Sequence, residues 1–243
     1  MMHGLLEDAP RVPGRYNDGH MNHDKKLDPP KPDHSSIDFS RAIWSNRPQR
    51  ASVAADAVSI TTDPHTDLWQ RSYYGFRNDN APVLQLWTES NFTFTVKVDF
   101  QYQGQFDQCG VVMYLNSENW FKASIEHETG SLPRLGSVVT NAGYSDWATT
   151  DIEPRSSVWY RLSRRGPDFL IEASFDGTEF RQMRVFHLNT LGETTDKMGQ
   201  ADPPLPAMHE VPFGLYACSP LDSSFTARFS SMCYEPCLWK AHR

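Results

Sequence analysis

The chain of 243 residues has no long apolar run and no excess of basic residues. No stretch reaches the roughly eighteen consecutive apolar residues that a membrane-spanning helix needs, so we expect no membrane association. The net charge is -7 and the isoelectric point is near 5.7. Nucleic acids and anionic membrane surfaces attract basic proteins, so this charge argues against both as partners.

Cysteine is scarce, with 4 residues. The first residues, MMHGLLEDAPRVPGRYND, contain no apolar core of the kind that a secretory signal has, so we expect a cytoplasmic protein with reduced thiols. Cys233, Cys237 and His242 would supply part of a metal site, but no fourth ligand is apparent. The sequence also lacks a glycine-rich phosphate loop and a dinucleotide fingerprint. We therefore expect neither a metal nor a cofactor.

Large apolar residues are rare in residues 1–40, which carry several prolines and charges of both signs. Such a segment cannot bury enough surface to offset the entropy of ordering it, so we interpret it as a flexible tail. We expect a single folded domain over residues 41–232 and a C-terminal extension over residues 233–243.

Long helical patterns are missing, whereas short apolar patterns with turn signals recur. The clearest is NFTFTVKVDF at residues 91–100, whose strict alternation predicts a half-buried antiparallel strand. We expect further strands at 57–62, 67–74, 83–87, 110–115, 119–126, 135–141, 157–164, 168–175, 179–187, 211–218 and 224–231. So many strands exceed one open sheet, which predicts an all-β jelly roll of two packed antiparallel sheets. A closed ligand-holding barrel is the alternative.

The strand NWFKASIE at residues 119–126 carries the most chemistry. Successive side chains alternate between faces. Three apolar side chains therefore share one face, and the other carries Trp120, Lys122, Ser124 and Glu126. A polar ring could stack on the indole of Trp120 and bond to Lys122 and Glu126. An exposed strand face with ordinary charges is the alternative.

Other residues could extend this surface. Tyr114 and Tyr216 are candidates, although each could instead pack beneath a loop with its hydroxyl satisfied. We expect residues 141–147 to form a loop that could clamp a ligand at the groove edge with Trp147, or could simply plug the sandwich. His187 could act as a general base, which makes Glu126, His187 and Lys122 the catalytic candidates. No nucleophile elbow or complete triad is apparent.

Several motifs in order give the chain a resemblance to a known family. They are Thr66-Asp67-Leu68-Trp69, Tyr74-Gly75-Phe76, FDQCGVVMY, NWFKASIE, LGSVVTN and YSDWA, spread over residues 43–231. The chain resembles the regulation-of-enolase protein 1-like family, a domain of unknown function in the concanavalin A-like lectin/glucanase superfamily. The resemblance implies a β-sandwich with one concave sheet, a cytosolic location and a regulatory role linked to sugar metabolism.

For function, we expect a non-catalytic or regulatory protein that holds a carbohydrate or a small metabolite on the concave sheet. An enzyme that uses the same groove is one alternative: a sugar hydrolase or lyase, or a cyclase or isomerase acting on a hydrophobic metabolite. A scaffold that contacts a protein partner through the tail or through the long loop at residues 189–210 is another.

Overall fold

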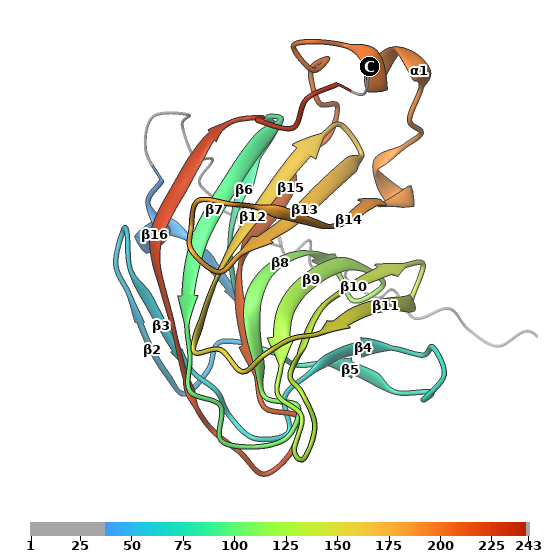
Figure 1. Ribbon diagram of the computed structural model, residues 1–243. Coiled ribbons are helices and arrows are strands. Elements are labelled where there is room, and N and C mark those ends of the chain that lie inside the picture. Colours follow the sequence, from blue (N-terminus) through green and yellow to red (C-terminus); the bar gives the residue numbers. More distant parts are fainter. Residues whose placement is uncertain (1–36, 242–243) are drawn as a thin grey trace, which may run out of the picture.

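Two antiparallel sheets pack face to face in the computed structural model, which describes residues 37–241 (Figure 1). The first sheet contains, in spatial order, β1 (Ile43–Ser45), β6 (Val83–Thr88), β15 (Val211–Cys218), β8 (Gln108–Asn116), β9 (Asn119–Glu126), β10 (Arg134–Asn141) and β11 (Tyr144–Asp151). The second contains β14 (Arg181–His187), β13 (Asp168–Ser174), β12 (Ser157–Arg165), β7 (Phe92–Asp99), β16 (Thr226–Pro236), β3 (Val58–Thr61) and β2 (Arg50–Val53). The predicted all-β jelly-roll sandwich is confirmed, and separate edge strands exclude a closed barrel.

The main core fills the space between the sheets. Along β7, Phe94, Val96 and Val98 are fully buried, because alternation points them all inward. The ring of Phe94 lies 5.0 Å from that of Phe213 on the opposite sheet and 5.8 Å from that of Phe39. These contacts join the two sheets and tie the start of the described chain to them.

Several short or exposed strands have no counterpart in the sequence prediction. They are β1, β2, β11 and β5 (Arg77–Asp79), which pairs with β4 (Leu68–Gln70). Instead of a loop at 141–147, Asn141 and Tyr144 pair across a tight hairpin in which Ala142 and Gly143 have φ of 48° and 74°. Both values suit a two-residue hairpin turn. As an edge strand, β11 is mostly exposed and gives a weak alternation signal.

Regular elements of the structure lie at both predicted domain boundaries. Residues 1–36 of the predicted tail lie outside the described residues, but Phe39 is fully buried at the start of a short helix, η1 (Phe39–Arg41). At the other end, β16 pairs with β7 as far as Pro236, with a shift in register between Ser230 and Cys233. The predicted C-terminal extension therefore begins inside a strand.

The long segment before β15 contains two short helices, η2 (Asn189–Leu191) and α1 (Asp196–Gln200), and it lies far from the β4–β5 hairpin in Figure 1. Buried arginines hold this segment. The guanidinium of Arg164 donates to the carbonyl of His209 at 2.6 Å, and that of Arg165 donates to the carbonyl of Met198 at 3.3 Å. Burial lowers the pKa of Arg164 to about 10, so it stays charged at neutral pH. Within residues 37–241, no helix is long and apolar enough to cross a membrane.

Candidate functional site

The β4–β5 hairpin covers part of the outer face of the first sheet, the face that points away from the main core. Leu68 of β4 is fully buried there. It belongs to a second apolar cluster with Ala81, Val83, Val112, Trp120, Val138, Tyr216 and Cys218. The outer face therefore has its own small core, which the hairpin segment completes by covering side chains of the sheet.

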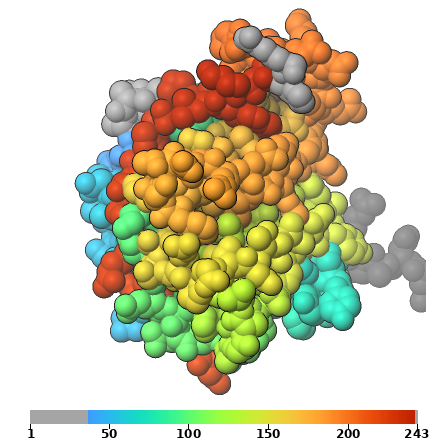
Figure 2. Space-filling view, viewed as in Figure 1, coloured from blue at the N-terminus to red at the C-terminus, as the bar shows by residue number. Residues whose placement is uncertain are grey.

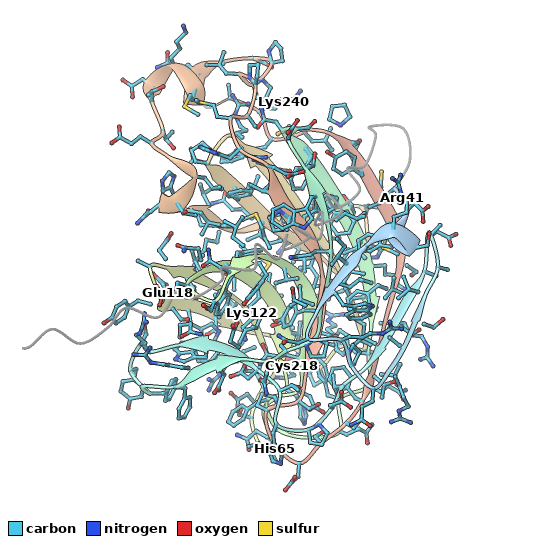
Figure 3. All side chains as sticks on the ribbon, turned by 180° about the vertical axis from the view of Figure 1, so that it is seen from behind. Arg41, His65, Glu118, Lys122, Cys218 and Lys240 are labelled. Atoms are coloured by element: carbon cyan, nitrogen blue, oxygen red, sulfur yellow. The ribbon has the colours of Figure 1, made fainter. Side chains whose placement is uncertain are left out.

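The hairpin is fixed to the sheet by polar contacts near its turn. Arg71 donates to the carbonyl of Gly143 at 2.9 Å and forms an ion pair with Glu118 at 2.7 Å. A Cβ on Gly143 would lie 1.7 Å from the Arg71 guanidinium, so this contact requires glycine. The backbone N–H of Gln70 donates to the hydroxyl of Ser145 at 2.9 Å. Figure 3 shows Glu118 and Lys122 on the side of the first sheet that faces the hairpin.

A pocket of about 540 Å³ opens between the hairpin and strands β8 to β11. In Figure 2 the hairpin (cyan) projects from the body of the molecule beside the yellow-green residues. Small residues leave the space: Ser124 and Gly136 are partners across β9 and β10, and both line the pocket. A Cβ on Gly136 would lie 3.0 Å from Nε1 of Trp147, so its absence lets that indole lie close to the strand.

A buried ion pair forms one end of the pocket. Nζ of Lys122 lies 3.3 Å from Oδ1 of Asp67, and their side chains are 5% and 18% exposed. The ammonium also lies 5.9 Å and 5.8 Å from the ring centroids of Trp120 and Tyr216. Burial disfavours the charged form, but the attraction of Asp67 and other acidic groups outweighs it, so the pKa of Lys122 lies above its usual value.

Glu126 lies further along β9 and faces the same pocket. Its carboxylate accepts a hydrogen bond from Gln108 at 2.9 Å, and Gln108 in turn accepts one from the Tyr216 hydroxyl at 3.1 Å. Burial raises the pKa of Glu126 to about 7, although the positive charge of Lys122 opposes this shift. Near neutral pH the carboxyl can therefore donate or accept a proton.

A second ion pair stands beyond Glu126. Nη1 of Arg134 lies 3.0 Å from Oε1 of Glu128, and Gln105 donates to the same carboxylate at 3.3 Å. The guanidinium of Arg134 also lies 5.6 Å from the ring centroid of Trp147. The pocket thus carries charged groups at both ends.

Aromatic side chains form one wall. The rings of Trp69 and Trp147 meet edge to face at 6.4 Å, and Trp69 meets Tyr74 in the same way at 5.4 Å. The rings of Tyr74 and Phe76 stack at 5.3 Å with an interplanar angle of 9°. A polar ligand with an apolar ring face can stack on such a wall and form hydrogen bonds with the charged groups nearby.

The structure brings together three of the predicted site residues. Lys122, Glu126 and Trp147 all line the pocket. The predicted alternation along β9 is confirmed, since Phe121, Ala123 and Ile125 point into the main core. Of the three pocket residues, Lys122 and Glu126 lie on β9 and Trp147 lies on β11, and β10 lies between these two strands.

The other predicted residues do not reach the pocket. Trp120 and Tyr216 are fully buried beneath it, so neither presents a ring face to a ligand. The hydroxyl of Tyr114 donates to the carboxylate of Asp79 at 2.8 Å. His187 lies on β14 in the second sheet, where its Nδ1 is 2.8 Å from Asp168. Glu126 and His187 therefore do not form an acid–base pair.

Sequence reasoning missed the aromatic wall from the hairpin, as well as Gln108 and Arg134. The available signal is the aromatic density of DLWQRSYYGF around Gly75, where the sequence pattern predicts a single strand at 67–74. His242 of the considered metal set lies outside the described residues. Among those described, no group of three or more His, Cys, Asp or Glu side chains could hold a metal ion.

A second cavity of about 600 Å³ lies at the open edge between the sheets, with residues of β11 and β14 in its lining. Its lining contains one aromatic side chain, Phe175, which lies against Arg155 at 4.5 Å. The pocket beneath the hairpin combines more aromatic surface with buried charge, so we take it as the candidate site.

Comparison with known proteins gives a family and a fold. Residues 44–237 match the family described as "Protein of unknown function (DUF1349)". Regulation of enolase protein 1 of Saccharomyces cerevisiae is 28% identical over 207 residues, which cover 85% of this chain and 95% of that protein. The crystal structure of a functionally unknown protein from S. cerevisiae has a TM-score of 0.70 at 27% identity, and the match covers 84% of this chain and 100% of that one.

More distant structures are similar in fold alone. A xylan β-1,4-xylosidase from Bacillus halodurans has a TM-score of 0.52 at 11% identity, over 74% of this chain and 32% of that chain. An alginate lyase from Klebsiella pneumoniae has a TM-score of 0.50 at 7% identity, over 76% of this chain and 82% of that chain. Their activities do not transfer to this chain at such identities.

The buried ion pair gives a stability prediction. Asp67→Asn should lower the free energy of unfolding by about 3 kcal/mol, because it leaves the Lys122 ammonium buried without its partner. The double variant Lys122→Met/Asp67→Asn should recover part of this loss, since it removes the buried charge itself. Asp146→Asn, at a carboxylate that is 79% exposed in its pair with Arg184, should cost less than about 1 kcal/mol. Denaturant unfolding measures all three, and equal losses in the single and double variants would contradict the prediction.

Glu126 gives a pH prediction. Its pKa is about 7 in the folded protein against a usual value of 4.5, so folding favours the protonated carboxyl. This contribution is fully present below about pH 4.5 and is lost as the pH rises through 7. Relative to Glu126→Gln, the wild-type protein should lose up to about 3 kcal/mol of unfolding free energy over this range. A pH-independent difference between the two proteins would show that the carboxyl does not titrate in this way.

Proposed function

The chain belongs to the DUF1349 family, and we propose that it is a regulatory binding protein that holds a carbohydrate or another small metabolite in the pocket beneath the β4–β5 hairpin. One observation carries this proposal: a single pocket is lined both by several aromatic side chains and by charged hydrogen-bonding groups. A sugar ring has apolar C–H faces and polar edges, so it matches both surfaces.

The charged groups are suited to bind hydroxyls. The ammonium of Lys122 and the guanidinium of Arg134 only donate hydrogen bonds, whereas the carboxylates of Asp67 and Glu128 only accept them. Glu126, with its pKa of about 7, can do either near neutral pH. Since a sugar hydroxyl both donates and accepts, such alternating partners could bind several hydroxyls of one ring. The mutual ion pairs also keep these side chains in fixed positions before a ligand arrives.

The regulatory part of the proposal rests on the relative from yeast, whose name refers to regulation of enolase. We extend regulation, but no named target, to this chain. A protein that binds a metabolite without consuming it could report the concentration of that metabolite to a partner. The proposal keeps the cytoplasmic location that the sequence predicts.

Ligand binding tests the proposal directly. A thermal-shift and calorimetry panel of neutral sugars, sugar acids and phosphorylated sugars should contain a ligand, which at a hundred times its dissociation constant stabilises the protein by roughly 2.7 kcal/mol. Trp147→Ala should weaken that ligand at least about tenfold, because it removes part of the aromatic wall. Trp87→Ala is the control, because Trp87 lies on β6 of the same sheet and does not line the pocket. A panel without any stabilising ligand would refute the proposal.

An enzyme that uses the same pocket is the second candidate, and the raised pKa of Glu126 favours it. A carboxyl that titrates near neutral pH suits general acid–base catalysis. On this alternative, a bound ligand is converted to product, and Glu126→Gln abolishes conversion while it retains binding. Product analysis of the wild-type protein and of this variant after long incubation separates the two. Recovery of the ligand unchanged from the wild-type protein would leave binding as the function.

A further inference from the structure

The turn of the β4–β5 hairpin presents aromatic side chains to solvent. Tyr74 and Phe76, which we call the aromatic platform, are 50% and 53% exposed although their rings stack on each other. Both also line the pocket. A stacked, half-exposed aromatic pair that continues the wall of a pocket offers a second flat surface beside the first.

The platform is held in place by a strained and well-anchored turn. Arg71 and Tyr73 have φ of 57° and 59°, in the left-handed region that side chains with a Cβ rarely adopt. The turn closes through backbone bonds from Arg71 to Phe76 at 2.6 Å and from Gly75 to Arg71 at 2.7 Å. The Trp69 indole donates to the carbonyl of Ser72 at 3.0 Å. Such strain persists only where the surrounding structure imposes it, and it clusters at functional sites.

The polar side of the pocket is longer than one ring. Lys122 and Glu126 are four residues apart on β9, which corresponds to about 14 Å along a strand. This length is about two and a half times the 5.3 Å between the stacked Tyr74 and Phe76 rings. Arg134 and Glu128 continue the charged side beyond Glu126. A single sugar ring would leave part of this charged row without contacts.

We infer that the ligand is a carbohydrate of at least two linked rings, with one ring in the pocket and the next stacked on the platform of Tyr74 and Phe76. This inference rests on the proposed function and narrows its ligand class from any sugar or small metabolite to an oligosaccharide. The pre-positioned platform lowers the entropic cost of binding the second ring, so its effect is a gain in affinity with chain length.

Calorimetry on the full chain tests this inference with glucose, xylose and their linked oligomers of two to four units. An oligomer of a sugar that binds should do so about tenfold more tightly than the single unit. The double variant Tyr74→Ala/Phe76→Ala should remove this gain, with a smaller loss of affinity for the single unit, because both rings also line the pocket. Trp87→Ala is again the control, because Trp87 lies on β6 and does not line the pocket. Thermal unfolding of each variant verifies that it is folded.

The outcomes separate this inference from the proposed function. Equal affinities for the single unit and its oligomers would overturn the two-ring ligand but leave the sugar site intact. An equal loss of both affinities in the double variant would also overturn it, because the platform would then belong to the first ring. If no oligomer or single unit binds while another metabolite does, the ligand is not a carbohydrate chain and the inference fails. If nothing binds, the proposed function fails with it.

Discussion

The contact between Lys122 and Asp67 determines how the candidate site is built. It joins the middle of β9 to the residue that precedes β4, so it links the first sheet to the hairpin that covers it. A lysine with so little exposure requires an anionic partner, and here the partner also accepts a hydrogen bond from the backbone of Leu68 at 2.7 Å. The same carboxylate therefore neutralises the buried charge and directs the hairpin. The pocket exists because the hairpin is held in that position.

Much of the sandwich could be predicted from local alternation, because each strand with one buried face has that pattern in its own sequence. The faces of β7 and β9 follow in this way. What covers a face could not be predicted, because that depends on a segment far away in the chain. Trp120 and Tyr216 were expected to touch ligand, yet residues around Leu68 bury both. Alternation predicts which side chains share a face of a strand. Whether that face is exposed to solvent depends on the tertiary fold.

The strands that the sequence did not predict and the placement of His187 far from Glu126 have related causes. Edge strands such as β11 need few apolar residues, so they resemble loops in sequence, and the turn at Ala142 and Gly143 looks like any polar connection. His187 and Glu126 both lie on strands with mixed patterns, but nothing local assigns a strand to one sheet or the other. The pairing of β13 with β14 sets that assignment. Residue types thus indicated the chemistry of the site more reliably than they indicated which residues line it.

The hairpin also has a consequence for how the protein moves. Residues 65–81 hold one side of the pocket, but they pair only with each other as strands and contact the sheet through side chains and a few backbone bonds. Such a unit is the part of a sandwich that can detach while the rest stays folded. Detachment would expose the Lys122 ammonium and the apolar cluster to water together. The free energy of opening therefore includes the loss of the Lys122–Asp67 ion pair. A ligand that contacts both the hairpin and the sheet would raise the free energy of this opening. Binding in the pocket would then slow amide hydrogen exchange in the hairpin segment alone.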